Sequence, residues 1–313
     1  MWLELSQDAQ RQFVDAQSAF VAYEDALRDA EQVRGGIHWK TQGSYEYLIR
    51  TTVGNVQKSL GPRSPETEQI YEKFVARKLA AEQRLASLRD VLERNQKLNR
   101  ALHVGRAPNI LIEILFRLAK SNLSNHFVVI GTHALFAYES AAGVFLAPEA
   151  LATRDVDLLW DTRRRLEFLT TMKRLDTHFL GLLKKVDPTF ALHSDDKSKA
   201  INSEAFEVDV TRREAHEGDP NPLRVTEHDD DFYAIQARRA GVLLSGPRFS
   251  QIITSVNGQM ARMNTISPAM YAKFKRWMSV QQDRDPLKRT RDLYQAEIVE
   301  ALITERLPHI SDT

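Results

Sequence analysis

The sequence predicts an α/β or α+β fold, in which a small mixed β-sheet is flanked by N-terminal and C-terminal helical regions. Three short apolar runs, at residues 127–130, 155–159 and 206–210, contain β-branched residues and are too short for helices, so we interpret them as buried strands. A helical pattern follows the first run, and long amphipathic stretches lie on either side of this central region. We expect three regions: residues 1–105, 106–215 and 216–313.

Length and composition are those of an ordinary soluble protein. The 313 residues are enough for two or three compact units with their own cores. A net charge of +1 with 27% charged residues does not indicate a globally basic nucleic-acid binder. This composition does not exclude a basic face on one part of the surface. Cysteine is absent, which excludes disulfides and zinc–thiolate sites.

No targeting or membrane segment is recognisable. The first residues lack the basic start and apolar core of a signal peptide. No window approaches the roughly 20 apolar residues of a membrane span. We therefore expect a cytoplasmic protein without membrane contact, whose oligomeric state the sequence leaves open.

Residues 5–33 and 65–103 predict two long helices in the first region. In the first, Phe13, Phe20 and Leu27 recur every seven residues, with Val14 and Val21 beside them. We interpret it as a packing helix, in preference to a dimerisation helix, because the repeat is short for a coiled coil. Ser64-Pro65 supplies the N-cap and first position of the second helix.

Between these helices, residues 37–52 have the alternation of a β-hairpin or extended arm. Trp39, Lys40, Tyr45 and Tyr47 suit stacking on a base and contact with phosphate. The alternative, of equal weight, is that these aromatic residues anchor the arm to the core. Residues 58–63 are expected to form a loop.

The candidate chemistry lies in the central region. Gly131 directly follows the first strand, where it lets the backbone approach a phosphate closely, and Thr132 adds a hydroxyl donor. Asp155 and Asp157 are at i and i+2, so both point to one side of a strand. Such a pair next to apolar residues calls for a cation between the acids, and Mg²⁺ prefers oxygen ligands. With Asp209 on a third strand, the carboxylates can bind two divalent ions.

Other polar residues near these strands have two interpretations each. His133 is imaginable as a general base, but we favour a structural role. Arg154 precedes the acids and either offsets their charge or touches a phosphate. For Arg163, Arg164 and Arg165, after the second strand, we favour a solvated face over contact with an acceptor RNA. Arg212 and Arg213 directly follow the third strand, where they can face the active cleft.

The last region contains a hairpin signal and two helices. Asn257-Gly258 fits a type I′ turn between alternating strands. Ser267-Pro268 starts a helix that carries Lys273, and a later helix carries Lys288 and Asp292 at i and i+4, which pairs them on one face. Surface charge is one interpretation of both lysines, and we give it about the same weight as the nucleotide contact that the resemblance described below implies.

The order Gly131-Thr132 after a strand, Asp155-x-Asp157 on a strand and Asp209 on another resembles the polymerase-β-like nucleotidyltransferases, and more narrowly a poorly characterised bacterial branch of them. The motif covers about a third of the chain. The resemblance implies that Asp155, Asp157 and Asp209 are catalytic and hold two Mg²⁺ ions, with Mn²⁺ as a substitute. It also implies a nucleoside triphosphate such as ATP, bound by Gly131, Thr132, Arg154, Lys273 and Lys288.

The resemblance predicts transfer of a nucleoside monophosphate to an acceptor hydroxyl. An RNA 3′ end is slightly favoured over a protein or small-molecule hydroxyl, because of the aromatic arm and the arginines. Thr132 replaces the family's Ser or Gly, and the spacing from Gly131 to Asp155 is 24 positions, longer than in compact members. These departures motivate an alternative: a non-catalytic nucleotide-binding or regulatory protein of a toxin–antitoxin or defence system.

Overall fold

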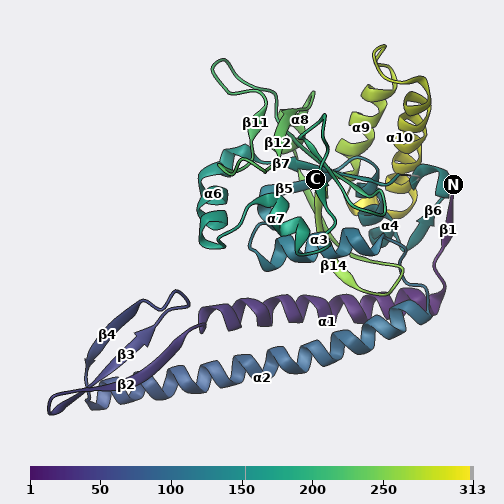
Figure 1. Ribbon diagram of the computed structural model, residues 1–313. Coiled ribbons are helices and arrows are strands. Elements are labelled where there is room, and N and C mark those ends of the chain that lie inside the picture. The colour runs from purple at the N-terminus through teal and green to yellow at the C-terminus, as the bar shows by residue number, and fades with distance from the viewer. Residues whose placement is uncertain (152, 311–313) are drawn as a thin grey trace. The chain divides into compact units, whose positions relative to one another are not determined.

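A computed structural model describes residues 1–151 and 153–310 (Figure 1). The chain divides into two compact units, which we call the sheet unit (Met1–Gln10 with Leu102–Thr313) and the N-terminal unit (Arg11–Ala101). The predicted class is confirmed: helices accompany a mixed β-sheet that contains all three strands expected around the acids. Residues 216–313, which we expected as a region of their own, lie in the sheet unit together with residues 106–215.

The N-terminal unit is built on two long helices, α1 (Gln7–Gln32, from residue 11 onward) and α2 (Pro65–Ala101), which run side by side in Figure 1. They are antiparallel, since Gln12 Nε2 donates to Asn99 Oδ1 at 3.0 Å while Arg84 pairs with Asp29 at 3.1 Å. Phe13 and Phe20 are buried as predicted, and Ala16, Tyr23 and Ala26 complete their face. Val14 and Val21, expected beside this stripe, are exposed instead, because the buried face is narrow.

A three-stranded antiparallel sheet joins α1 to α2. The predicted hairpin is confirmed as β2 (Gly36–Gln42) and β3 (Tyr45–Thr51). The expectation of a loop at residues 58–63 is wrong, because β4 (Gln57–Pro62) pairs with β3. The polar sequence of β4 has no apolar alternation to reveal a strand; pairing with the edge of β3 is what orders it. A register shift lies at Leu48/Ile49.

The sheet unit contains most of the secondary structure. Its strands are β1 (Trp2–Glu4), β5 (Phe127–Ile130), β6 (Val144–Leu146), β7 (Asp155–Trp160), β8 (Ala191–Leu192), β9 (Lys199–Ile201), β10 (Glu207–Arg212), β11 (Leu223–Arg224), β12 (Tyr233–Gln236), β13 (Arg248–Thr254) and β14 (Met260–Ile266). Its α-helices are α3 (Asn109–Lys120), α4 (Leu135–Ala142), α5 (Pro148–Leu151), α6 (Arg165–Arg174), α7 (Phe179–Lys184), α8 (Ala240–Ser245), α9 (Pro268–Ser279) and α10 (Pro286–Arg306). Short 3₁₀ turns are η1 (Ser124–His126), η2 (Thr132–Ala134), η3 (Thr162–Arg164) and η4 (Pro308–Ile310).

The main sheet runs in the order β11-β12-β10-β7-β5-β14-β13, with β9 paired to β10 and β8 to β9. Strand β10 is parallel to β7, whereas β5 is antiparallel to β7. The carboxyl end of β5 therefore meets the amino end of β7, and β10 runs alongside in the same direction. This arrangement brings Gly131, Asp155 and Asp209 to one region of the sheet.

Apolar packing fixes these strands. Four consecutive β5 residues are buried, as are Leu158, Leu159 and Trp160 at the end of β7. The predicted hairpin is confirmed as β13–β14, and β14 extends the sheet beside β5. The expected type I′ turn at Asn257-Gly258 is wrong, because it needs positive φ at both residues and only Gly258 has one, at 84°. Helices α3 and α4 pack on this hairpin, and α9 packs along α10. Strand β7 is thus paired with β5, which lies next to this packed hairpin.

Candidate active site

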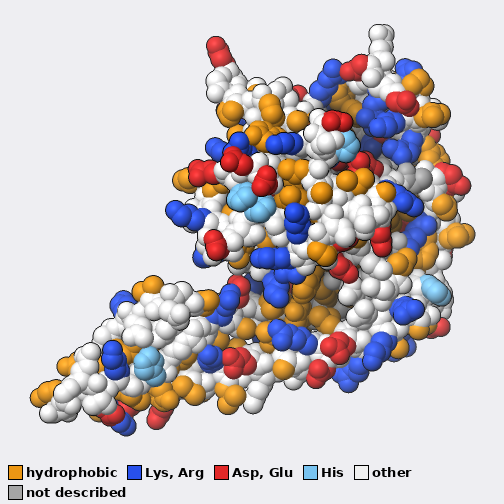
Figure 2. Space-filling view, in the orientation of Figure 1, with side chains coloured by type: hydrophobic (Ala, Val, Ile, Leu, Met, Phe, Trp, Pro, Cys, Tyr) orange, Lys and Arg blue, Asp and Glu red, His pale blue; other side chains and the backbone are white. Residues whose placement is uncertain are grey.

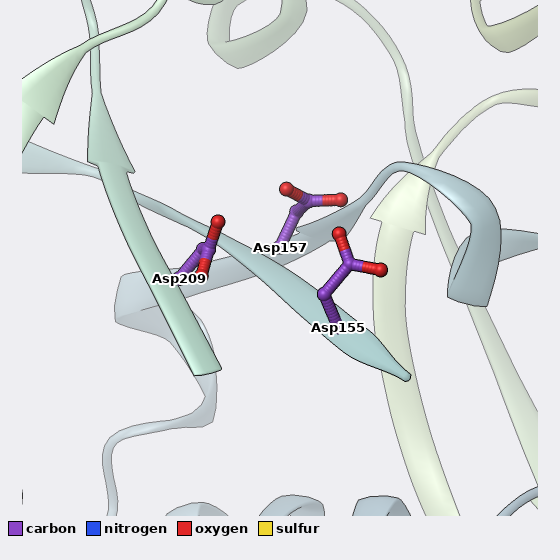
Figure 3. Close-up of side chains that lie close together, drawn as sticks. All are labelled: Asp155, Asp157 and Asp209. Carbon is purple, nitrogen blue, oxygen red and sulfur yellow. The ribbon is translucent and has the colours of Figure 1, made fainter. Parts of the chain in front are cut away.

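Three carboxylates converge at the amino end of β7. Asp155 and Asp157 project from one face of β7, and the register pairs Asp209 of β10 directly with Asp157. One carboxylate oxygen from each of the three lies within 4.8 Å of the other two. Figure 3 shows the three carboxylates pointing to the same side of the two strands. The residues that the sequence singled out in separate strands therefore form one cluster.

Gly131 lies directly against this cluster. Its backbone has φ 70° and ψ −158°, a conformation that is essentially restricted to glycine. A Cβ at this position would overlap Asp157 Oδ2 and lie 2.9 Å from Asp157 Cγ. The turn from β5 into η2 thus needs glycine for its conformation and for the space that the acid occupies.

The cluster is electrostatically unfavourable without a cation. Burial, together with the negative charges of Asp155 and Asp209, raises the pKa of Asp157 to about 7. Burial also raises the pKa of Asp209. Its Oδ1 atom is buried and has no hydrogen-bond partner in the described part of the chain. Three oxygen donors, one of them without a partner, fit a hard divalent ion such as Mg²⁺.

Thr132 and His133 follow Gly131 and are both buried. The Thr132 hydroxyl accepts a hydrogen bond from Gln295 Nε2 of α10 at 3.1 Å. His133 Nδ1 lies 2.9 Å from the backbone carbonyl of Asp155, so it is the protonated nitrogen that donates. Burial lowers the pKa of His133 to about 4, which keeps the ring neutral. His133 therefore acts structurally, tying η2 to the start of β7.

Lys275, which we did not predict as a site residue, is buried in α9. Its Nζ lies 2.8 Å from Asp292 Oδ1, and Arg284 Nε lies 2.7 Å from the other oxygen, Oδ2. The charge of Lys275 also lowers the pKa of Asp157, against the larger opposing effects. The expected pairing of Lys288 with Asp292 is wrong, because these two cations occupy both oxygens of Asp292. Tyr271, Ala272 and Lys275 form one buried helix face, a pattern that could have identified Lys275.

The other predicted nucleotide contacts are exposed. Lys273 and Lys288 are solvent-facing residues of α9 and α10, and Figure 2 shows Lys and Arg side chains gathered over these helices. Arg154 is exposed and its guanidinium lies 3.3 Å from the Glu204 carbonyl oxygen. The structure therefore brings Gly131 and the three acids together, and leaves these three cations at the surface.

Four of the five arginines after the second and third strands make contacts within the sheet unit. Arg163 binds Asp161, with Nη2 to Oδ2 at 2.6 Å, and Arg164 pairs with Glu167. Arg212 is buried and donates to the Pro220 carbonyl, and Arg213 pairs with Asp219 at 3.0 Å. These contacts give the four arginines structural roles.

The geometry defines a class: a glycine turn beside carboxylates from two neighbouring strands of a mixed sheet, as in polymerase-β-like nucleotidyl transfer. A family model described as nucleotidyltransferase matches residues 109–313. The chain belongs to this nucleotidyltransferase family, which confirms the resemblance. No curated protein and no solved structure matches the chain. Among the described residues, no helix is both long and apolar enough to span a membrane.

Proposed function

We propose that the protein is a metal-dependent nucleotidyltransferase that transfers a nucleoside monophosphate from a nucleoside triphosphate such as ATP to an acceptor hydroxyl. The convergence of Asp155, Asp157 and Asp209 beside Gly131 carries this proposal. Asp155 and Asp157 would hold two Mg²⁺ ions, or Mn²⁺ in their place, and Asp209 would complete one of the two sites. When bound, the ions would supply positive charge to the triphosphate and to the acceptor oxygen.

The chain's own residues position the reactants. Gly131 leaves space for the Asp157 carboxylate and would let the backbone approach the phosphates closely, and Asp209 would accept the acceptor hydroxyl's proton. The acceptor oxygen forms a bond to the α-phosphorus while the bond from that phosphorus to the bridging oxygen breaks. Pyrophosphate leaves with the bonding electrons.

Further nucleotide contacts are proposed at Thr132, Arg154, Lys273 and Lys288, and we add Lys275. Lys275 is supported by its positive charge, which acts on Asp157 in the acidic cluster. Nucleotide titrations of K275M and K273M separate the two lysines of α9. Weaker binding in K275M alone assigns the contact to the buried lysine; weaker binding in K273M alone assigns it to the exposed one.

The transfer itself is tested with purified protein, each α-labelled nucleoside triphosphate, Mg²⁺ and fractionated cell extract. We expect label in one fraction, with loss of transfer in D155A and retention in D195A, a matched change of an exposed acid. Equal transfer by D155A would reject the mechanism. Tight nucleotide binding without transfer to any fraction would favour the non-catalytic, regulatory alternative from toxin–antitoxin or defence systems.

We propose that the acceptor is RNA, in preference to a protein, and that it binds to the surface of β2 and β3. Lys40 pairs with Tyr47 and Gln42 with Tyr45, so these side chains share one face. Tyr45 is 66% exposed. Trp39 instead packs on Tyr71 of α2, with ring centroids 5.9 Å apart, as the anchoring interpretation requires.

The charge of this segment supports a polyanionic partner. Residues 34–63 contain five Lys or Arg and one Glu, in a chain whose net charge is only +1. Single-stranded nucleic acid is bound by such combinations of exposed aromatic rings and cations. Fluorescence anisotropy with labelled single-stranded RNA should show weaker binding for Y45A and K40A than for K73A, which changes an exposed lysine of α2. Equal affinity in all three variants would remove RNA binding from this face.

A further inference from the structure

Lys199 introduces a positive charge into the acidic cluster. Strand β9 pairs with β10 so that Lys199 lies directly opposite Asp209, on the same face. Its Nζ lies 3.1 Å from Asp209 Oδ2 and 3.4 Å from Glu207 Oε2. The sequence gives no sign of this contact, because the pairing depends on the β8–β9 hairpin.

The cluster contains a fourth carboxylate, Glu207, in addition to the three predicted ligands. The register of β7 with β10 pairs Glu207 with Asp155, just as it pairs Asp209 with Asp157. Four carboxylates therefore lie on one face of two adjacent strands. Lys199 contacts the two on β10, whereas neither acid of β7 has an ion pair in the described residues.

The two oxygens of Asp209 are in different situations. Oδ2 is paired with Lys199, and Oδ1 is buried without a hydrogen-bond partner among the described residues. An ion that binds Asp209 would therefore lie close to an ammonium group and be repelled by it. An ion held by Asp155 and Asp157 alone would not face this direct competition.

We propose that Lys199 is a positioning residue that holds Asp209 and Glu207 in place without an ion and weakens binding of the divalent ion at Asp209. Two like charges about 5 Å apart near a protein surface interact strongly enough to change affinity by about tenfold or more. Lys199 thereby makes the two ion sites unequal. The inference rests on the proposed metal dependence of the site.

The test measures Mn²⁺ binding to the full chain by calorimetry, together with thermal unfolding. We expect K199M to bind Mn²⁺ at least about tenfold more tightly than the unaltered chain does. K199R, which keeps the positive charge, should bind Mn²⁺ with the affinity of the unaltered chain. K120M, which changes an exposed lysine at the end of α3, should leave affinity unchanged. Without ion K199M should unfold at a lower temperature, and saturating Mn²⁺ should reduce this difference.

Unchanged or weaker Mn²⁺ binding in K199M would overturn the inference. K199Q is measured in parallel as a second neutral variant, and the inference requires the same tightening there. If D155N is impaired while K199M equals the unaltered chain, only this inference fails. If the unaltered chain and D155N bind Mn²⁺ equally poorly, the proposed metal-dependent function fails instead.

Discussion

Replacing Gly131 by alanine tests the link between the β5 turn and the acids. The conformation of Gly131 costs another residue about 1–3 kcal/mol. In addition, the new Cβ would overlap Asp157 Oδ2, with Asp157 Cγ only 2.9 Å away. The Asp157 side chain must therefore rotate or shift away from Asp155 and Asp209. We expect G131A to lose stability and to lose ion affinity at the same time.

The size of the loss in ion affinity follows from the displacement of the Asp157 carboxylate, which is one of the proposed ligands. Changes that misplace a metal ligand without removing it weaken binding by about 10–100-fold. Calorimetric titration with Mn²⁺ measures this, and urea unfolding without ion measures the strain. Nucleotidyl transfer should fall at least as far as ion binding.

Gly143 provides a matched control. It ends α4 in the left-handed conformation, with φ 65° and ψ 36°, so alanine is strained there as well, by about 1–2 kcal/mol. A Cβ there would meet only Gln10, at 3.9 Å, an ordinary contact. G143A should therefore lose stability and keep its affinity for Mn²⁺. The reasoning is refuted if G131A binds Mn²⁺ as the unaltered chain does, or if G143A is impaired equally.

Two further predictions concern stability. Burial raises the pKa of Glu139 to about 7 from 4.5, against the opposing effect of Arg106, so the folded state retains a proton that the unfolded state has released. Its contribution to stability should be greatest below pH 4.5 and decrease by a few kcal/mol as pH rises to 7; urea unfolding of E139Q across this range should lack that slope. Asp231 is buried and accepts hydrogen bonds from the backbone N–H groups of Phe179 and Leu180 at the start of α7. D231A should lose about 1.5–3 kcal/mol and D230A, an exposed neighbour, less than about 0.5 kcal/mol; equal thermal shifts would contradict the capping role.

Much of the site could be predicted from local sequence. A buried strand has to be short and apolar, so β5 and β7 are visible, and acids at i and i+2 share a face wherever the strand lies. Asn257-Gly258 predicts its hairpin because Asn and Gly favour turns between alternating strands, although only Gly258 adopts a positive φ here. These features depend only on neighbouring residues.

The remainder depends on pairing between distant segments. Lys199 joins the acids through the register of β9 with β10, and Gln295 reaches Thr132 across 163 positions. The choice between Lys273 and Lys275 depends on which face of α9 is buried. Strand β4 is polar, so it is a strand because its backbone pairs with β3, and its own side chains do not predict it. No local pattern contains this information.

Calorimetric titration of Mn²⁺ into the unaltered chain, D155N, D157N, D209N and D195N shows whether acids from β7 and β10 hold divalent ions together. We expect the unaltered chain and D195N to bind the ions equally, and D155N and D157N to bind at least about tenfold more weakly, since each removes one charged ligand. D209N should weaken binding of the ion that Asp209 shares with the acids of β7 by at least about tenfold. Unchanged binding of both ions in D209N would show that acids from the two strands do not share an ion, and would refute the proposed site.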